Sequence, residues 1–294
     1  MRLLYFALAA GLLATAYADT AVLRGEHLEA QIDPATGRLT QLSLPGGSGQ
    51  ILTSPGIEVR TAQQVQVRFI TGSWLLPADP TLTDKPWRIL RQSSRQLTVE
   101  SSPSPLLGLR TSQTYEIDPK KPALHIRTTL TRTDKNPFPV QVWLIVPVPL
   151  PDFMLLETPP AWRDTRHAWT ELSNPGVLNR AIVQEFSDAI RFSPPLNSPH
   201  PKIGTLGRWV AGVYRDRVVV LVTKPTHGSY PDASSVQAYA ATNRAELETV
   251  SPNRHLKPSE RLVSESTLWV FSRDPAVPAE RLPQWIDARL KAYR

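Results

Sequence analysis

The chain has 294 residues and no cysteine, so a stable fold depends on a large hydrophobic core and not on disulfides or a cysteine-linked lipid. Its formal net charge is +7, and the basic residues are scattered with no run of four, which argues against a nucleic-acid groove. The 29 prolines punctuate short apolar runs, a texture typical of many strands joined by turns.

The first residues have the layout of a cleavable export signal. Arg2 precedes an apolar run over residues 3–13, and Ala16-Tyr17-Ala18 follows soon after it. This run is shorter than the roughly 20 residues that span a bilayer, and the small residues of the triplet suit a signal peptidase. We therefore expect residues 1–18 to be removed, leaving residues 19–294 as one domain, periplasmic or secreted, with no membrane anchor.

Alternating apolar and polar residues predict strands along most of this domain. The clearest is Ala123–Arg132, where Leu124 and Ile126 fall on one face and polar residues fall on the other. A hairpin is predicted over residues 209–214 and 217–223, and its second strand, apolar on both faces, is expected in the centre of a sheet. The other expected strands are residues 22–32, 38–44, 65–71, 96–100, 109–117, 140–146, 181–192, 236–240, 245–250 and 261–271.

Many strands followed by one helical tail indicate an all-β, mainly antiparallel fold: a large two-sheet sandwich with a short C-terminal helix. Trp285, Ile286 and Leu290 share one face at helical spacing, so we expect this helix to lie against the sandwich. Residues 147–201 are rich in proline and polar residues yet contain Trp169, and there we expect a long structured excursion.

Familiar catalytic motifs are missing from the sequence, which has no HExxH, no Gly-rich phosphate loop, no cysteine and no G-x-S-x-G. The six histidines are scattered, so we expect no metal and no cofactor.

Two carboxylates in the predicted strand 245–250 are the most suggestive pair. Glu246 and Glu248 stand two residues apart, so they project from the same face about 6 to 7 Å from each other. In a cleft their mutual repulsion would raise one pKa and provide an acid and a base for proton transfer to a sugar. On spacing alone, a solvated strand face or partners for nearby arginines is the simpler explanation of the pair.

Tryptophans are the second feature that points to a ligand. Trp74, Trp143 and Trp209 stand near proline or glycine turns or at strand ends. Their flat faces suit the apolar faces of pyranose rings, although most large aromatics belong to the core of a sandwich.

Four segments carry a resemblance to a known family. They are EAQIDPATGRLTQLSLPGG (29–47), TYEIDPKKPALHIRTTLTRTDKNPFPVQVWLIVPV (114–148), KIGTLGRWVAGVY (202–214) and AELETVSPNRHLKPSERL (245–262). Through them the chain resembles the galactose-mutarotase-like superfamily, in particular a branch of exported bacterial proteins. The resemblance implies a large antiparallel sandwich with a sugar cleft on a concave face, and it places Leu247-Glu248 where the family has its catalytic base.

Two departures from the family pattern bear on activity. The family's catalytic acid is a histidine, and Trp143 stands in that neighbourhood here. A second substrate-binding histidine of the family has no counterpart, and the region around Trp74 occupies its place. Without an acid to protonate the ring oxygen, sugar ring opening should be slow, so the resemblance implies sugar binding more than mutarotation.

Three hypotheses for function follow. The first is an exported carbohydrate-binding protein with weak or no mutarotase activity. The second is a sugar epimerase or glycoside-active enzyme with Glu248 as general base and Glu246 as its partner. The third is a non-catalytic structural or protein-interaction module, since a fold alone does not fix a function. The oligomeric state and the identity of the sugar are not predicted. The residues expected to line the sugar cleft are Trp74, Trp143, Lys202, Trp209 and Glu248.

Overall fold

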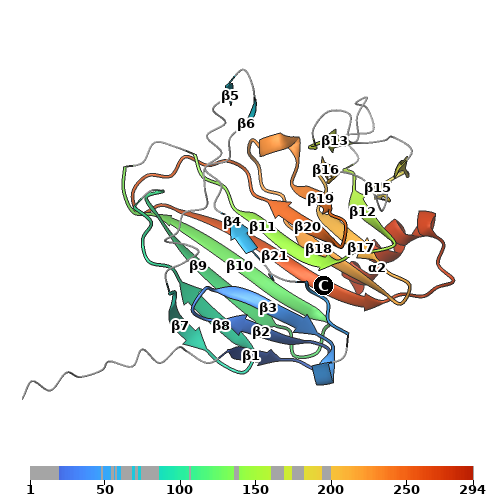
Figure 1. The fold of residues 1–294 in the computed structure, drawn as a ribbon, viewed down its shortest axis with the longest axis horizontal. Helices are drawn as coiled ribbons and strands as arrows, with labels where there is room; N and C mark the ends of the chain where they lie inside the picture. Colours follow the sequence, from blue (N-terminus) through green and yellow to red (C-terminus); the bar gives the residue numbers. More distant parts are fainter. Residues whose placement is uncertain are drawn as a thin grey trace, which may run out of the picture.

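The computed structural model describes residues 20–47, 49–53, 56, 58–60, 68–69, 72–73, 86–105, 107–135, 139–159, 169–173, 182–193 and 200–293. These residues form antiparallel sheets of ten, six and three strands, a two-stranded ribbon and a C-terminal helix (Figure 1).

Hydrogen-bonded neighbours are adjacent in the spatial strand order of each sheet. In the ten-stranded sheet this order is β14 (Val183–Glu185), β15 (Ala189–Phe192), β12 (Phe153–Glu157), β17 (Trp209–Val213), β18 (Arg217–Thr223), β21 (Arg261–Ser272), β10 (Ala123–Arg132), β9 (Leu109–Ile117), β8 (Gln96–Glu100), β7 (Arg88–Gln92). In the six-stranded sheet it is β13 (Thr170–Glu171), β16 (Lys202–Thr205), β19 (Val236–Ala240), β20 (Arg244–Val250), β11 (Trp143–Pro149), β4 (Glu58–Arg60). The small sheet comprises β1 (Ala21–Arg24), β2 (Glu29–Asp33) and β3 (Arg38–Ser43), the ribbon β5 (Arg68–Phe69) and β6 (Gly72–Ser73), and the helix is α2 (Leu282–Ala292).

One apolar layer joins the three sheets. It takes Leu144 and Leu247 from the six-stranded sheet, Leu221 and Leu268 from the ten-stranded sheet, and Ile32 from the small sheet, all of them buried. Because successive side chains of a strand point to opposite faces, every second residue of these strands lies in this layer. The predicted two-sheet sandwich is confirmed, with the small sheet closing the same core.

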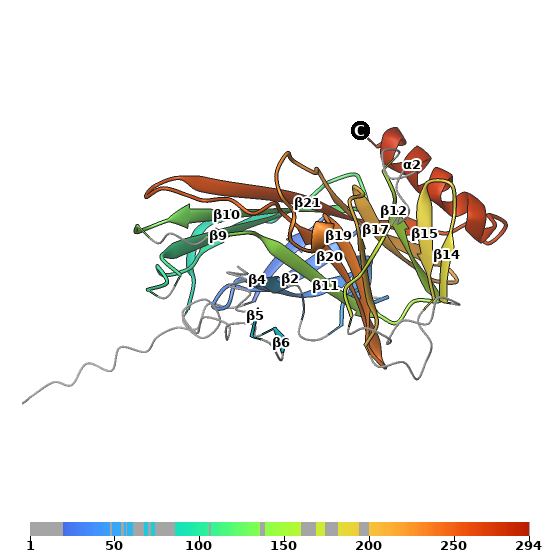
Figure 2. The same cartoon turned by 90° about the horizontal axis from the view of Figure 1, so that it is seen from above.

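Strand β18 lies in the interior of the ten-stranded sheet, between β17 and β21, as its apolar sequence predicts. Val219 faces the layer shared by the sheets, whereas Val218 and Val220 face a second apolar cluster that includes Ile286 and Leu290 of α2. The helix therefore lies against the outer face of this sheet, beside β12 and β17 (Figure 2), which confirms the predicted helix and its location.

Two segments predicted as single strands are hairpins. In residues 22–32 the chain turns between β1 and β2, where the Gly25 N–H donates to the Leu28 carbonyl at 2.9 Å. The backbone of Asp118 approaches this turn so closely that a Cβ on Gly25 would lie 2.6 Å from the Asp118 carbonyl oxygen. In residues 181–192 the strands β14 and β15 pair with each other. β-favouring residues flank each turn on both sides, so the sequence pattern alone predicts one continuous strand.

The prediction of a long loop excursion over residues 147–201 is wrong for residues 153–157. These residues form β12, which is buried along its whole length between β15 and β17. An apolar strand that is covered on both faces shows no alternation, so its pattern does not distinguish it from a capping loop. Trp169 of the same segment is half-buried, and its indole N–H donates to Glu185 Oε1 at 3.1 Å.

The expected signal at residues 1–18 lies outside the described residues, and the boundaries of the single domain remain a prediction. Over the described ranges, no helix has both the length and the apolar character needed to cross a membrane.

The contact between α2 and the sheet yields a first test. Ile286 is 0% exposed, so Ile286→Ala removes buried methyl groups and leaves a cavity, which should lower the free energy of unfolding by about 2–5 kcal/mol. Urea unfolding followed by circular dichroism measures this change. Lys291→Ala, on the exposed side of the same helix, is the control and should change stability by less than about 0.5 kcal/mol. Equal effects from the two substitutions would contradict the packing of α2.

Candidate functional site

The candidate site lies on the outer face of the six-stranded sheet. In β20, Ala245 and Leu247 point into the shared core, so Glu246 and Glu248 both point to the opposite face. The two carboxylates therefore share a face, as their spacing predicts.

Strand register places further polar residues on that face. Glu248 pairs with Gln237 of β19 and with Ile145 of β11, while Glu246 pairs with Tyr239 of β19. Tyr239 in turn pairs with Lys202 of β16. These strands lie side by side in Figure 1, so the face carries two adjacent cross-strand rows that include the glutamates.

Glu248 is held by two donors that converge on one oxygen. Its Oε2 accepts a hydrogen bond from the Trp143 indole at 2.6 Å and forms an ion pair with Lys202 Nζ at 2.7 Å. The Lys202 ammonium also lies 4.4 Å from the centre of the Trp143 ring, a cation–π contact. The Glu248 side chain is 0% exposed and that of Lys202 is 17% exposed. A carboxylate buried this deeply requires such charge compensation.

The second oxygen of the same carboxylate is not compensated in this way. Glu248 Oε1 is buried and has no hydrogen-bond partner among the residues that the structure describes. A buried acceptor without a donor is unfavourable, by about 1–3 kcal/mol or more for a charged group. The whole Glu248 side chain is 0% exposed, so a hydroxyl or amide of a ligand reaches this acceptor only if the residues that cover it move aside.

Glu246 has a different environment from Glu248. Its Oε1 accepts a hydrogen bond from Arg244 Nε at 3.2 Å and forms an ion pair with the same guanidinium, whose NH2 also lies 3.2 Å away. Burial is the main cause that raises the pKa of Glu246, and the nearby Glu248 raises it further, while Arg244 and Lys202 act in the opposite direction. The two carboxylates are thus held in unequal electrostatic settings.

Two residues of this face are absent from the sequence-based predictions. The Tyr239 hydroxyl and His200 Nδ1 are joined by a hydrogen bond of 2.6 Å, and the two rings stack with centroids 5.8 Å apart. Burial, followed by the charge of Glu246, raises the pKa of Tyr239. Alternation within β19 could have placed Tyr239 on the polar face, but no local pattern marks His200.

The other predicted ligand residues do not all join this group. Trp209 is 1% exposed, packs in the cluster under α2 and donates from Nε1 to Asp287 Oδ1 at 3.2 Å. Trp209 belongs to the ten-stranded sheet, so the prediction that it lines a cleft with Glu248 is wrong. It packs in the core because an indole has a large apolar area to bury. Trp74 lies outside the described residues. Of the predicted ligand residues, the structure brings Trp143 and Lys202 to Glu248.

Metal-ligating side chains do not cluster in the part of the chain that the structure describes, where no three His, Asp or Glu residues are grouped in a way that could hold an ion.

Comparison with solved structures identifies the fold. A galactose mutarotase-like protein from Lactobacillus casei matches with a TM-score of 0.61 and 10% identity, over 86% of this chain and 100% of that one. A galactose mutarotase related enzyme from Lactobacillus acidophilus matches with a TM-score of 0.60 and 8% identity, over 88% and 99%. An aldose epimerase homologue from C. elegans matches with a TM-score of 0.55 and 12% identity, over 87% and 99%.

At these identities the likeness concerns the fold: the chain has the galactose-mutarotase-like fold, as the sequence resemblance implies. No protein-family model and no curated protein matches the sequence.

The buried ion pair generates a test of stability. Lys202→Met removes the ammonium and leaves the Glu248 carboxylate buried without its counter-charge, so the free energy of unfolding should fall by about 3–5 kcal/mol. In the double variant Lys202→Met/Glu248→Gln the uncompensated charge is gone, and much of this loss should be recovered. Urea denaturation of the single and double variants measures both effects. If the losses of unfolding free energy caused by the two substitutions simply add in the double variant, Lys202 and Glu248 are not directly coupled.

The raised pKa of Glu246 generates a test of pH dependence. The folded chain holds the Glu246 proton more tightly than the unfolded chain, so this stabilisation is complete below the ordinary pKa of 4.5 and is lost as pH rises through the higher folded value. Glu246→Gln removes that loss. We expect the stability of the variant relative to the unmodified chain to increase from about pH 4 to about pH 7. Urea unfolding of both proteins across this range measures the difference, and a difference of the opposite slope would refute the assignment.

Proposed function

We propose that the chain is a carbohydrate-binding protein that holds a sugar on the outer face of the six-stranded sheet, with little or no turnover. The proposal rests on the different environments of the two carboxylate oxygens of Glu248. One oxygen is committed to Trp143 and Lys202, and the other is a buried acceptor without a donor among the described residues. A sugar hydroxyl is a neutral donor of suitable size for that acceptor.

The residues around Glu248 favour binding over catalysis. Conversion of sugar anomers requires a base for the anomeric hydroxyl and an acid for the ring oxygen, both able to exchange protons. The two side chains that contact Glu248 Oε2 are an indole, which does not titrate, and an ammonium that is already paired with the carboxylate. These groups are suited to fixing the carboxylate in place, with Oε1 as a buried acceptor that a ligand reaches by displacing the residues that cover it.

The structural relatives lend support of a general kind. Their names describe a galactose mutarotase-like protein and an aldose epimerase homologue, and their fold is the fold of this chain. Because unrelated functions share folds, this support concerns the class of ligand and not the reaction.

We also propose that the protein acts outside the cytoplasm, in the periplasm or the external medium. The support is the basic residue, short apolar run and Ala-Tyr-Ala triplet within residues 1–18.

A second candidate function is a sugar epimerase or glycoside-active enzyme in which Glu248 is the general base. It is favoured by the unequal environments of Glu246 and Glu248, because a carboxyl group with a raised pKa beside a carboxyl group that is paired with a lysine is a common acid–base arrangement. In this case Glu246 would donate the proton, and Tyr239 with His200 would lie close enough along the strand rows to contact the same substrate.

The proposal is tested by calorimetry of residues 19–294 against a panel of monosaccharides and short oligosaccharides. We expect one class to bind, and we expect Glu248→Gln and Trp143→Phe each to weaken that binding by roughly 10-fold or more, the value of a lost hydrogen bond to a charged group. Glu280→Gln, an exposed carboxylate on another part of the chain, is the matched control and should bind normally.

Polarimetry on the same sugar distinguishes the two candidates. Binding without acceleration of anomer exchange supports the binding protein, whereas acceleration that Glu248→Gln abolishes supports the enzyme. No binding of any sugar at millimolar concentration would contradict both.

A further inference from the structure

The outer face of the ten-stranded sheet is divided into a covered half and an open half. Helix α2 covers the half formed by β12, β17 and β18, where the outward side chains are apolar and buried, among them Phe153, Ala211 and Val220. Over β8, β9 and β10 the outward side chains are polar, and several of them are exposed. The open half is therefore free to contact a ligand or partner.

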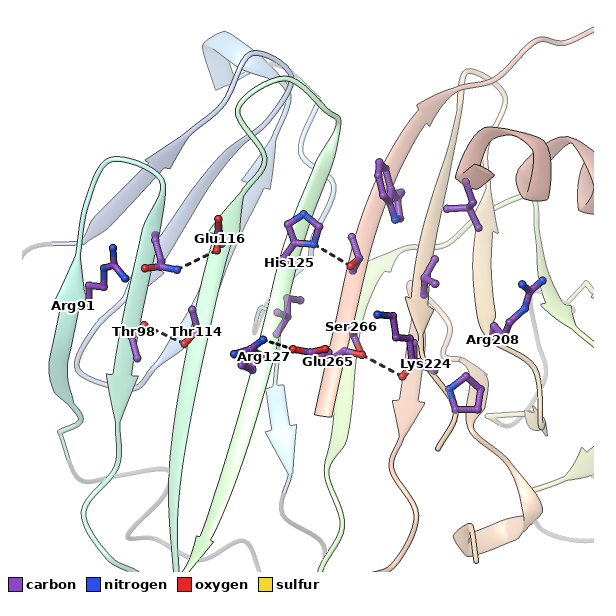
Figure 3. Close-up of a pocket in the computed structure, with 18 residues that line it drawn as sticks. Arg91, Thr98, Thr114, Glu116, His125, Arg127, Arg208, Lys224, Glu265 and Ser266 are labelled. Atoms are coloured by element: carbon purple, nitrogen blue, oxygen red, sulfur yellow. Dashed lines mark hydrogen bonds and ion pairs between the residues drawn. The ribbon is translucent and has the colours of Figure 1, made fainter. Parts of the chain in front are cut away.

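The open half is hollowed into a groove of about 1030 Å³. Its lining includes Leu290 of α2 and Trp269, which packs in the same cluster as Leu290. Arg91 and Arg208 lie at opposite sides of the groove in Figure 3. Ligand pockets commonly measure about 300–1,000 Å³, so the groove has room for more than one sugar ring.

Strand register arranges the floor of the groove in two parallel rows. The first row runs through Gln96, Glu116, His125 and Thr267, on four neighbouring strands. The second row runs through Arg91, Thr98, Thr114, Arg127 and Glu265, on five neighbouring strands. Successive positions in a row are about 4.8 Å apart, so hydrogen-bonding groups recur at a regular spacing across the groove.

The floor groups are held in place by contacts with one another. Thr98 and Thr114 share a hydrogen bond of 3.0 Å between their hydroxyls, and His125 Nδ1 lies 3.1 Å from the Thr267 hydroxyl (Figure 3). The floor is thus a surface of ordered polar side chains, including three threonine hydroxyls, with further capacity to donate and accept.

Positive charge exceeds negative charge along the groove. The lining contains Arg91, Arg127, Arg208 and Lys224 against Glu116 and Glu265, four cations against two anions and a net charge of +2 with His125 neutral.

Both carboxylates of the lining are already engaged. Glu116 accepts from the Gln96 amide at 3.0 Å, and Glu265 is paired with Arg127. Arg208 is likewise engaged by Glu157. With Arg127 and Arg208 paired, two cations, Arg91 and Lys224, remain against the carboxylate of Glu116, whose amide partner carries no charge, so the balance along the groove is +1. Arg91 and Lys224 lie toward opposite sides of the groove in Figure 3.

We infer that this groove binds an acidic oligosaccharide, a chain that carries carboxylates as well as hydroxyls. The polar groups of the two rows match sugar hydroxyls, and the separated cations match carboxylates along a chain. A neutral chain would call for aromatic platforms, but Trp269 is the one Trp, Tyr or Phe in the described lining and is 7% exposed. The groove belongs to the opposite sheet from Glu248, so this inference is independent of the function proposed for that site.

The test is calorimetry of residues 19–294 with tetragalacturonate, and with maltotetraose as a neutral chain of equal length. We expect tetragalacturonate to bind, binding to weaken as ionic strength rises, and maltotetraose to bind at least 10-fold more weakly. The triple variant Arg91→Gln/Arg127→Gln/Lys224→Gln should lose at least 10-fold in affinity for the acidic chain.

A matched triple variant separates the groove from overall charge. Lys120→Gln/Arg215→Gln/Lys257→Gln removes the same net charge from exposed positions outside the groove and should bind tetragalacturonate normally. Equal loss in both triple variants would overturn the inference in favour of nonspecific charge attraction. Equal binding of the two chains, preferred binding of a short DNA duplex, or no binding of tetragalacturonate at low salt would also overturn it. Glu248→Gln should leave this binding unchanged, so failure here and failure of the Glu248 site are distinguishable.

Discussion

The apolar layer between the two large sheets determines where the polar side chains of both sheets point. Strands with a period of two must turn one set of residues into this layer and the other set away from it. In β20 that constraint buries Leu247 in the layer and turns Glu248 outward, and in β10 it buries Ile126 and turns Arg127 outward. The same core therefore determines which side chains lie at the candidate sugar site on the outer face of the six-stranded sheet. It also determines which side chains line the groove on the outer face of the ten-stranded sheet.

Charged side chains are stabilised in different ways on the two outer faces. On the six-stranded sheet a single carboxylate is buried completely, and the structure compensates it with Lys202 and the Trp143 indole. On the open half of the ten-stranded sheet the charges are exposed, with 61% of the Arg127 side chain and 46% of the Glu265 side chain accessible. Water screens pairs of that kind, whereas the Glu248 pair depends on its geometry. A ligand at the first face must satisfy one specific acceptor, and a ligand at the second must match a pattern of separated cations.

Local pattern was sufficient to predict much of the fold. Local pattern indicates which faces are buried in three elements: β10 by its alternation, β18 by its apolar residues on both faces, and α2 by its helical spacing. Each of these patterns is visible within a few residues. The same rule placed Glu246 and Glu248 on one face. It failed for β12, where both faces are covered and the alternation disappears.

The composition of the candidate site depends on contacts that local pattern does not contain. Trp143 and Lys202 reach Glu248 across 105 and 46 residues of sequence. The family resemblance relates Trp143 and Glu248 to one site, and Lys202 joins them in the sequence analysis through the hypothesis of a sugar cleft. Trp209 shows the opposite case, because a tryptophan at a strand end is equally suited to a ligand cleft and to the packing of a helix. The His200–Tyr239 pair required the fold itself to be seen.

The most direct test of the account is a crystal structure of residues 19–294 with a bound sugar, chosen from the class that binds in solution. We expect a sugar hydroxyl within hydrogen-bond distance of Glu248 Oε1, while Oε2 keeps its contacts with Trp143 and Lys202. A sugar bound elsewhere, with Oε1 satisfied by a side chain of the protein itself, would contradict the central claim.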